Sequence, residues 1–484
     1  MSSQRLKKIC AIILVCYLVI SVGFYWISAE QLRFRDTWTD MATAAAPIGE
    51  LTGDVEVRQP FSVEADEIQS VSVRLSTYAR INTCTVRVQI RDMSGAVIAQ
   101  AEIPGEEIED NAVREIVFSE PVSVEPDKSY ELVLCSPDGV PGNAITAWFG
   151  NTMSAARVEI PLDISEEKQA VFGDTLLDGV LVHSFKLRSF LWFGQAYWYL
   201  VCGLGLFLIG YSLYLIRVAE KNGSTAVLRL IVAFDRYRYL MRQLIGRDFK
   251  TKYKRSVLGV LWSFLNPLLI MTVQYVVFST LFQSDIPNFP LYLLSGIVCF
   301  NFFNEASSMA LMSIVGNAAL ITKVYVPKYI YPVSRVLSSG INLLFSMIPL
   351  FAVMLLTGAP VRPALLLLPF GLLCLLVFSI GIGFILSAAM VFFRDTQFLW
   401  GVFSMLWMYA TPIFYPESII GEQYVLLFKC NPLYHIIRFI RIVLINGVSP
   451  EPKAYALCLI ASLVPLMIGA IIFKKNQDKF ILNL

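Results

Sequence analysis

The sequence predicts a polytopic α-helical membrane protein of about eight spans, with an antiparallel, jelly-roll-like β-sandwich inserted between the first two. Three observations predict this fold class. Hydrophobic residues make up 56% of the 484 residues. Apolar runs of about twenty residues recur along the chain, and this is the length of helix that crosses a bilayer. Between the first two runs, about 130 residues instead alternate apolar and polar side chains in short stretches, as half-buried strands do.

Eight stretches are long and apolar enough to cross a hydrocarbon layer about 30 Å thick as helices. They are residues 9–28, 191–216, 257–282, 291–313, 333–357, 364–391, 398–414 and 454–473. The first is expected to remain as an anchor helix within residues 1–29, with a signal peptide as the alternative. Its apolar run exceeds the about 7–15 residues of a signal peptide, and no small-x-small cleavage site follows. The second membrane helix is expected over residues 190–217.

Charged side chains divide the chain in two. Residues 30–189 carry 27 acidic and 13 basic side chains, whereas the segments expected in the cytoplasm carry 21 basic and 5 acidic ones. Lysines and arginines precede the first span and follow the last. The positive-inside rule therefore places both termini in the cytoplasm of a multi-pass cytoplasmic (plasma) membrane protein, and the sandwich over residues 50–189 on the extracytoplasmic side.

Six short runs rich in valine and isoleucine are expected to be strands. They are IQSVSVRLSTY from Ile68, CTVRVQI from Cys84, AVIAQAEI from Ala96, VREIVF from Val113, SYELVLC from Ser129 and AITAWFG from Ala144. Turn-prone pieces separate them at roughly ten-residue intervals, which is typical of an antiparallel sandwich. Two of the runs contain Cys84 and Cys135, and a disulfide between them is one possibility on the oxidising side.

The sandwich also contains residues of the kinds that bind sugars, where a ring packs on a sugar face and polar groups bond the hydroxyls. The candidates for glycan contact are Tyr78, Arg80, Asn82, Asp110, Asn111, Asn143 and Trp148. The favoured alternative is that Tyr78 and Trp148 are core aromatics and that the polar residues form turns. Around these positions, TYARINTCTVRVQIRDMSG loosely resembles sandwich modules of bacterial sugar-handling membrane proteins. Docking of another envelope protein is equally open.

Residues 226–255 form a basic amphipathic segment directly before a membrane span. Between Val227 and Ile245, apolar residues recur at three- and four-residue spacing, while arginines occupy the other faces. A helix of this kind lies along a membrane surface, held by apolar burial and by attraction to anionic headgroups. A simple lipid anchor is one interpretation. A cytoplasmic interface or gate helix for the spans that follow is the other.

Five segments follow one another in the C-terminal half. They are RDFKTKYKRSVLGVLWSFLNPL from Arg247, KVYVPKYIYPVSRVLSSGIN from Lys323, FFRDTQF from Phe392, YATPIFYP from Tyr409 and NPLYHIIRFIR from Asn431. Through them, from about residue 226 to its end, the chain resembles the membrane subunits of ABC-type polysaccharide exporters, which move O-antigen, capsule or teichoic acid chains. Each segment is weak alone, and their shared order makes them specific.

The resemblance implies a homodimer that encloses a channel for a lipid-linked glycan, with a six-helix permease core over residues 256–484. It also implies a separate cytoplasmic ABC ATPase that holds ATP and Mg. The sequence agrees, because no G-x-x-x-x-G-K-[ST] phosphate loop occurs in the chain. No cofactor, catalytic residue or metal site is expected in this chain, and no nucleic acid is expected as a partner.

Two cytoplasmic elements are suited to receive the motion of an ATPase. One is the basic helix, and the other is the loop over residues 316–332, which by resemblance is the coupling loop. Prolines stiffen this loop, and its lysines and tyrosines suit an interface. The predicted coupling interface comprises Arg247, Asp248, Lys250, Lys254, Arg255, Lys323, Tyr325, Pro327, Lys328 and Tyr329. An ordinary positively charged loop is the alternative.

The connection over residues 417–449 is too long and too apolar for a plain loop. It is expected to form two short helices that dip back into the membrane and are broken at Asn431-Pro432. By resemblance, this hairpin is the outer gate. Its candidate residues are Asn431, Pro432, His435, Arg438 and Arg441. The two arginines either meet phosphate or acidic sugars or extend to lipid headgroups, and the histidine is expected to be structural.

Five residues of the core are candidates for the glycan path. They are Trp400, Phe403, Trp407, Tyr409 and Glu305. Aromatic rings give weak, register-tolerant contacts with sugar faces. The alternative for the rings is the aromatic belt found at membrane interfaces. Glu305 is costly inside a span, so it is expected either to line the path or to pair locally.

Three other functions compete with glycan export. A related fold can export drugs or small lipids. A membrane-embedded glycosyltransferase would need clustered acidic residues beside the spans, whereas the chain outside the sandwich has ten scattered acids and no D-x-D pair. A sugar-sensing receptor would need a cytoplasmic signalling domain rather than six further spans.

Overall fold

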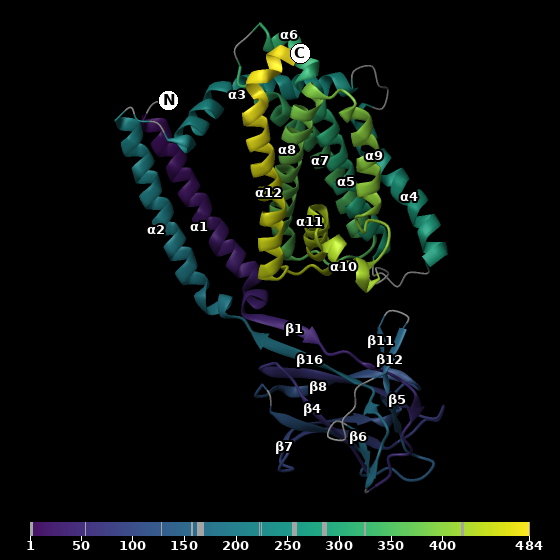
Figure 1. The fold of residues 1–484 in the computed structure, drawn as a ribbon. Coiled ribbons are helices and arrows are strands. Elements are labelled where there is room, and N and C mark those ends of the chain that lie inside the picture. Colours follow the sequence, from purple (N-terminus) through teal and green to yellow (C-terminus); the bar gives the residue numbers. More distant parts are fainter. Residues whose placement is uncertain are drawn as a thin grey trace. The chain divides into compact units, whose positions relative to one another are not determined.

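A computed structural model describes the chain at all positions except 1–2, 54, 127, 156–157, 162–168, 222, 224, 254–258, 283–287, 324–325, 418–420 and 484. The chain divides into two compact units (Figure 1). The membrane unit comprises Met1–Gln31 and Ala196–Leu484, and the β unit comprises Leu32–Gln195. The sandwich is thus an insertion between two helices that belong mainly to the membrane unit.

The β unit consists of two main antiparallel sheets and one small sheet. The first contains β1 (Phe34–Trp38), β3 (Ala46–Pro47), β5 (Glu67–Ser76), β8 (Ala112–Ser123), β10 (Thr146–Gly150), β15 (Val180–Leu181) and β16 (His183–Phe190). The second contains β4 (Glu56–Ser62), β6 (Thr85–Asp92), β7 (Val97–Pro104), β9 (Ser129–Cys135), β13 (Val171–Phe172) and β14 (Thr175–Leu176). The small sheet contains β2 (Ala42–Thr43), β11 (Thr152–Ala155) and β12 (Val158–Pro161).

The two main sheets share one apolar core, which confirms the predicted sandwich. Val57 of β4 and Val88 of β6 are fully buried in the same cluster as Val71 of β5 and Phe185 of β16. Alternate residues of β4 are buried, because successive side chains of a strand point to opposite faces. All six predicted strands form. Two of them, β6 and β7, pair as a local hairpin, whereas β5 pairs with β16, which is distant in sequence.

The possible disulfide of the β unit is not formed. Cys84 and Cys135 are both buried and both free. In the antiparallel register of β6 and β9, Cys135 lies opposite Arg87, so Cys84, three residues earlier, is displaced along the strand. Two cysteines offset in this way are too far apart for the Cα separation of a disulfide, about 4.4–6.8 Å.

The membrane unit is entirely helical among its described elements. Its α-helices are α1 (Ser3–Arg33), α2 (Trp192–Glu220), α3 (Ala226–Tyr253), α4 (Trp262–Phe282), α5 (Phe289–Leu311), α6 (Ala318–Ile321), α7 (Ile330–Leu356), α8 (Leu368–Phe392), α9 (Thr396–Tyr409), α10 (Glu422–Lys429), α11 (Pro432–Arg441), α12 (Pro452–Asn476) and α13 (Phe480–Asn483). The basic segment forms α3 as predicted, and the broken hairpin forms α10 and α11.

Six helical segments of the described chain are long and apolar enough to cross a membrane, or seven if the pair Phe289–Leu311 and Val315–Ile321, bent by 54°, is one span. With the bent pair counted as one span, they correspond to seven of the eight expected spans. The eighth, over residues 398–414, differs, because α9 has only 14 residues. At about 1.5 Å per residue this helix is about 21 Å long, which is shorter than the hydrocarbon layer.

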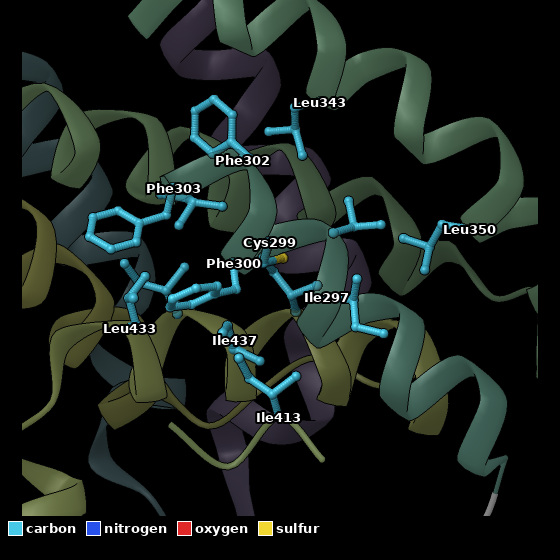
Figure 2. Packing of buried hydrophobic residues seen from close by; sticks show 14 of the residues in the cluster. Ile297, Cys299, Phe300, Phe302, Phe303, Leu343, Leu350, Ile413, Leu433 and Ile437 are labelled. Carbon is cyan, nitrogen blue, oxygen red and sulfur yellow. The ribbon is translucent and has the colours of Figure 1, made fainter. Parts of the chain in front are cut away.

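Helix α5 lies at the centre of the membrane unit. Phe303 and Leu294 are fully buried, and the surrounding cluster includes Leu433 and Ile437 of α11 (Figure 2). Helices α8 and α12 pack so closely that a Cβ on Gly469 would lie 2.2 Å from the carbonyl oxygen of Gly381. Small residues permit such backbone approach between membrane helices. Helix α11 is therefore part of the core.

Candidate functional site

A polar cleft opens where α3 ends, against α4, α5 and α7. It consists of two cavities of about 310 and 530 Å³ that share Lys252 and Glu305. The first is also lined by Trp262, Ser263, Asn266, Pro267, Val298, Asn301, Phe302, Ser339, Asn342, Leu343 and Ser346. Amides and hydroxyls at this depth are costly unless they face water, protein or a polar ligand. The cleft is therefore the strongest candidate for a functional site in the described chain.

An ion pair stands where the two cavities meet. Lys252 Nζ of α3 lies 2.9 Å from Glu305 Oε1 of α5. Asn342 of α7 donates a hydrogen bond of 2.6 Å to the same oxygen. The carboxylate is thus compensated by a cation and an amide, as an acidic residue within a helical bundle requires. Glu305 pairs locally, as one of its two expectations had it, and it also lines the cleft, while its place on a glycan path stays a prediction.

One helical turn before Lys252, α3 makes a second set of charged contacts. Arg335 Nη1 of α7 lies 3.1 Å from Asp248 Oδ2, and Arg247 Nη2 lies 3.0 Å from Asp248 Oδ1. Residues four positions apart share one face of a helix, so Asp248 and Lys252 lie on the face of α3 that meets α7 and α5. We call Asp248, Lys252, Glu305 and Arg335 the α3 clamp, because together they join α3 to α5 and α7.

The predicted coupling residues of α3 differ in their exposure to solvent. Asp248 is only 7% exposed, so its predicted place in an ATPase interface is wrong, because burial against α7 withdraws its carboxylate. Arg247 is exposed beside it and reaches Asn317 Oδ1 at 3.4 Å, ahead of α6. Lys250 is exposed on another face. Lys254 and Arg255 lie outside the described residues.

The predicted coupling loop holds the C-terminus of the chain. Lys328 Nζ donates a hydrogen bond of 2.5 Å to the carbonyl oxygen of Gln477 and lies 5.9 Å from the ring of Phe480. Pro327 and Tyr329 are half-buried. Lys323 is exposed, and Tyr325 lies outside the described residues. Lys328 therefore has an internal role that the prediction of an interface contact did not include.

Asn431 joins the end of α9 to the start of α11. Its side-chain oxygen accepts hydrogen bonds from Trp407 Nε1 at 2.8 Å and from Leu433 N at 3.1 Å. Its amide donates to Thr411 Oγ1 at 2.8 Å. The second of these bonds is a helix N-cap, and Pro432 occupies the first position of α11, where its missing N–H costs nothing. The predicted break at this dipeptide is confirmed.

Arg441, at the end of α11, is buried and binds backbone carbonyls. Its guanidinium donates to Pro412 O at 2.6 Å, Ile413 O at 3.0 Å and Tyr292 O at 3.2 Å, and its Cζ lies 3.4 Å from the ring centroid of Tyr292. Both expectations for this arginine, an exposed anion site and a headgroup contact, are wrong, because it is only 6% exposed. It ties α11 to α5 and to the segment after α9.

The other two charged candidates of the hairpin have different surroundings. Arg438 is exposed and lies 3.8 Å from Glu417 and 3.3 Å from Tyr434 Oη. His435 Nε2 lies 2.7 Å from the carbonyl oxygen of Lys429, which fits its expected structural role. Of the two arginines of the hairpin, Arg438 and Arg441, only Arg438 is therefore exposed to a ligand.

The predicted aromatic path residues divide into two groups. Trp400 is buried and Trp407 is half-buried, and each packs edge-on against Phe303. The predicted place of Trp400 on a path is wrong for this chain by itself, because its ring is buried in the core, whereas that of Trp407 stays a prediction. Phe403 and Tyr409 are 53% and 59% exposed on α9. Only this second pair presents rings to anything outside the chain.

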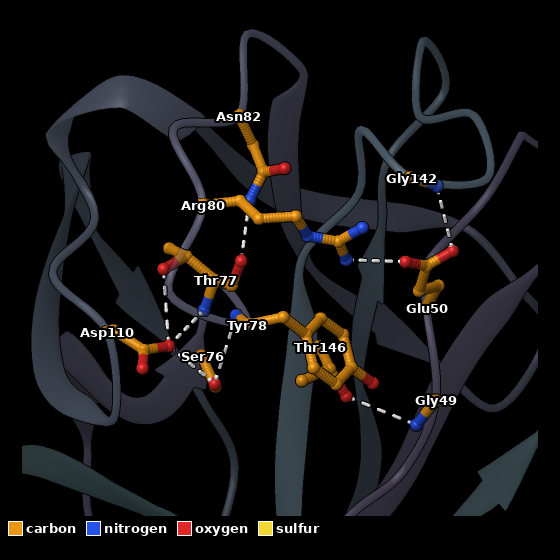
Figure 3. Close-up of polar contacts among 10 residues, drawn as sticks. All are labelled: Gly49, Glu50, Ser76, Thr77, Tyr78, Arg80, Asn82, Asp110, Gly142 and Thr146. Carbon is orange, nitrogen blue, oxygen red and sulfur yellow. Dashed lines mark hydrogen bonds and ion pairs between the residues drawn. The ribbon is translucent and has the colours of Figure 1, made fainter.

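In the β unit, one loop carries the first candidates for glycan contact (Figure 3). Tyr78 and Ala79 have φ of 54° and 56°, a left-handed conformation that non-glycine residues rarely adopt. Asp110 Oδ1 accepts hydrogen bonds of 2.7 Å from Ser76 Oγ and from Thr77 N, and these bonds hold the pKa of Asp110 below its ordinary value. Tyr78 is held 39% exposed at the surface.

Arg80 extends beside the tyrosine. Its guanidinium lies 5.0 Å from the ring centroid of Tyr78 and forms an ion pair of 2.5 Å with Glu50 (Figure 3). The hydrogen bond from Arg80 holds the pKa of Glu50 below its ordinary value, and Gly142 N adds a second bond to this carboxylate. Asn82 is fully buried, so its predicted contact with glycan is wrong. Its amide instead bonds the backbone of the loop.

The remaining candidates in the β unit are only partly brought together. Asn111 donates to Asp110 at 3.2 Å, beside the same loop. Asn143 accepts from Thr83 N at 2.8 Å and is a turn residue, as the favoured alternative expected. Trp148 is half-buried on β10, with the Arg74 guanidinium 5.6 Å from its ring. The candidates that remain at the surface are the exposed Tyr78 and Asn111 and the half-buried Arg80.

Sequence reasoning missed most members of the cleft, among them Lys252, Arg335 and Asn342. Arg335 and Asn342 lie in a membrane helix, where polar side chains usually mark functional positions. Lys252 follows Asp248 by four residues, which is the spacing of one helix face. These two signals are present in the sequence. What it does not show is which distant residue each side chain meets.

Helices of membrane length around a polar cleft are the arrangement expected of a membrane transport subunit. Within the described residues, no three His, Cys, Asp or Glu side chains are placed to hold a metal ion. Residues 239–445 match the ABC-2 type transporter family. The chain belongs to this family, as a permease subunit rather than an enzyme, and the family implies a partner ABC ATPase and a multi-pass membrane location.

Curated relatives match about half of the chain. An O-antigen export system permease protein RfbA of Klebsiella pneumoniae is 31% identical over 244 residues, 50% of this chain and 93% of the relative. An RfbA of Myxococcus xanthus is 28% identical over 256 residues, 52% of this chain and 98% of the relative. The polysialic acid transport protein KpsM of Escherichia coli is 23% identical over 250 residues, 51% of this chain and 96% of the relative.

Proposed function

We propose that the chain is the membrane subunit of an ATP-driven exporter that carries a lipid-linked polysaccharide, of the O-antigen, capsule or teichoic acid type, across the cytoplasmic membrane. The names of the relatives, O-antigen export permease and polysialic acid transport protein, support this substrate class. The observation in the structure that carries it is the cleft lined by Asn301, Asn342 and Ser346. Amides and hydroxyls offer a sugar chain hydrogen bonds that lipid tails cannot replace.

Two copies of the chain are proposed to enclose the path. The cavities of one copy, of about 310 and 530 Å³, fall in the range of small-ligand pockets and are too small to hold a polymer. A continuous path therefore requires surfaces from a second copy. The exposed rings of Phe403 and Tyr409 on α9 are suited to line it, since they give a sliding chain weak contacts.

The partner ATPase is proposed to act on α3 and on the loop before α7. The basic charge of α3 and of both chain ends supports a cytoplasmic position for these elements, and the acidic balance of residues 30–189 supports an extracytoplasmic β unit. Movement of α3 would have to separate the charges of the α3 clamp. Separating these charges costs energy, and the ATPase would supply this energy when it opens the cleft.

The β unit is proposed to contact the glycan through its exposed loop. Tyr78 presents part of its ring, Arg80 lies beside it, and Asn111 adds an amide. A ring with adjacent hydrogen-bonding groups is the usual composition of a sugar site. If glycan arrays show no binding that depends on Tyr78, the alternative of docking to another envelope protein takes its place.

The deciding experiment deletes the gene and follows lipid-linked glycan on both sides of the membrane. Export by this protein predicts that full-length polymer accumulates inside while surface polymer disappears, and that the wild-type chain restores both. Unchanged surface glycan would refute the proposal. Loss of a lipid or drug efflux activity, with normal glycan, would indicate the alternative within transport. Co-purification should recover a separate ATPase, whereas cross-links to cytoplasmic transferases alone would favour a glycosyltransferase.

A further inference from the structure

A third cavity of the membrane unit is apolar and lies away from the polar cleft. It has a volume of about 570 Å³ and lies between α1, α3 and the start of α7. Its apolar walls include Ile9 of α1, Ile231 and Met241 of α3, and Ile330 and Val333 of α7. The only charged residues among its described lining are Asp235 and Arg238. The cavity is therefore an apolar space with charge on one wall.

The two charged residues of this cavity differ in their partners. Asp235 is 3.2 Å from Arg5 of α1, so its charge is compensated. Arg238 is exposed and makes no ion pair within the described part of the chain. Two more exposed arginines, Arg236 and Arg242, lie on the same helix. An uncompensated positive charge thus borders an apolar cavity.

We propose that this cavity binds one acyl chain of an anionic phospholipid, whose phosphate contacts Arg238. The apolar walls remove the chain from water, and a guanidinium binds a phosphate by two parallel hydrogen bonds. A basic surface helix attracts anionic lipids by about 1 kcal/mol for each cation near the membrane surface. Neither a peptide nor a sugar combines a long apolar part with a single terminal anion. A bilayer phospholipid does.

The position of the cavity gives the lipid a structural role. Tyr329, at the end of the loop before α7, and Ile330, the first residue of α7, form one wall, and Ile9 belongs to the helix that precedes the β unit. A bound chain therefore fills the space between α1, α3 and this loop. Lipid binding in this cavity goes beyond the proposed function, because it does not depend on which substrate the protein exports. The family match begins at residue 239, so α1 and Arg238 lie outside it.

The test uses the full-length chain in nanodiscs of equimolar phosphatidylcholine and phosphatidylglycerol. Native mass spectrometry should show retained phosphatidylglycerol, and Arg238→Gln should reduce its retention about fivefold. Arg229→Gln, which removes the same charge from an exposed position of α3 outside the described cavity lining, is the matched control. Equal retention of the two lipids, or equal loss in the two variants, would overturn the proposal.

A second measurement does not depend on a variant. Phosphatidylglycerol with a diazirine in its acyl chain should label the cavity wall, at Met241, Ile231 or Val333. Labelling confined to the outer faces of α2 and α4 would overturn the proposal. Displacement of the labelled lipid by low concentrations of a polyprenyl phosphate would also overturn it, because the cavity would then belong to a lipid carrier.

Discussion

Lys252 of α3 and Glu305 of α5 meet at 2.9 Å between Nζ and Oε1, at the point where two polar cavities join. Asn342 of α7 donates to the same carboxylate oxygen. The last turn of α3 therefore cannot leave α5 without separating opposite charges. If α3 is the element that the ATPase moves, this ion pair sets part of the energy that opening requires.

Lys252→Met should impair export, because it leaves Glu305 without its cation. The two side chains are 41% and 30% exposed, so water screens the pair and its expected coupling energy is about 1 kcal/mol. Surface polysaccharide and ATPase stimulation, measured at equal protein level, report the loss. The swap of Lys252→Glu with Glu305→Lys should recover part of it.

The matched control for this prediction is Lys221→Met. Lys221 is exposed, follows α2 and lines neither cavity of the polar cleft, so its replacement removes the same charge without touching the α3 clamp. If the two variants lose export equally, the effect belongs to net charge and the ion pair has no specific role.

Gly296→Ala should destabilise the membrane unit. A Cβ at this position of α5 would lie 2.7 Å from Arg441 Nη2 and 3.0 Å from Ile413 Cγ2. Because the guanidinium is fixed by three carbonyls, it cannot move aside without losing hydrogen bonds, and the expected cost is about 1–3 kcal/mol. Thermal unfolding in detergent measures it. Gly210→Ala in α2, with nothing within 4 Å, should be neutral or stabilising.

Phe480→Ala should release the C-terminus from the loop before α7. The ring is fully buried and packs edge-on against Phe473 at 5.2 Å, beside Lys328. Its truncation should cost about 3 kcal/mol locally and expose the C-terminus to carboxypeptidase. Leu482→Ala is the control, since Leu482 is 85% exposed. Identical digestion of both variants and the wild type would contradict the internal role of Lys328.

The β unit could be predicted from the sequence because its signals are local. Alternation places Val71 and Val73 in the core whatever strand lies beside them. The pairing of strands is not local, and so the sequence could not exclude a disulfide between Cys84 and Cys135. Only the register of β6 and β9 shows that the two cysteines are offset.

The membrane unit shows a related limit. Hydropathy predicts that an apolar stretch is removed from water, and it does not distinguish lipid from protein. From the sequence, Trp400 was expected on the glycan path and Arg441 at an anion or a lipid headgroup. Each side chain is instead buried against other helices of the same chain. The expected span over residues 398–414 differs for another reason, since α9 ends at Tyr409 and is too short to cross the hydrocarbon layer. Thr411 and Asn431 end α9 by hydrogen bonds that join positions far apart in sequence.

Acid should destabilise the β unit, because protonation of Glu56 removes its ion pair with Arg91. Two hydrogen bonds of 2.9 and 2.7 Å join β4 to β6 through these side chains, and they hold the pKa of Glu56 below its ordinary value of 4.5. A carboxyl with a lowered pKa stabilises the folded state above the unfolded pKa, and this contribution is lost as the pH falls through the folded value. The loss should therefore begin below about pH 4.5. Scanning calorimetry of the full-length protein should show it, with Glu56→Gln less stable near neutral pH and less sensitive to acid. The exposed Glu64→Gln is the control, and an acid transition unchanged by Glu56→Gln would show that other carboxyls govern it.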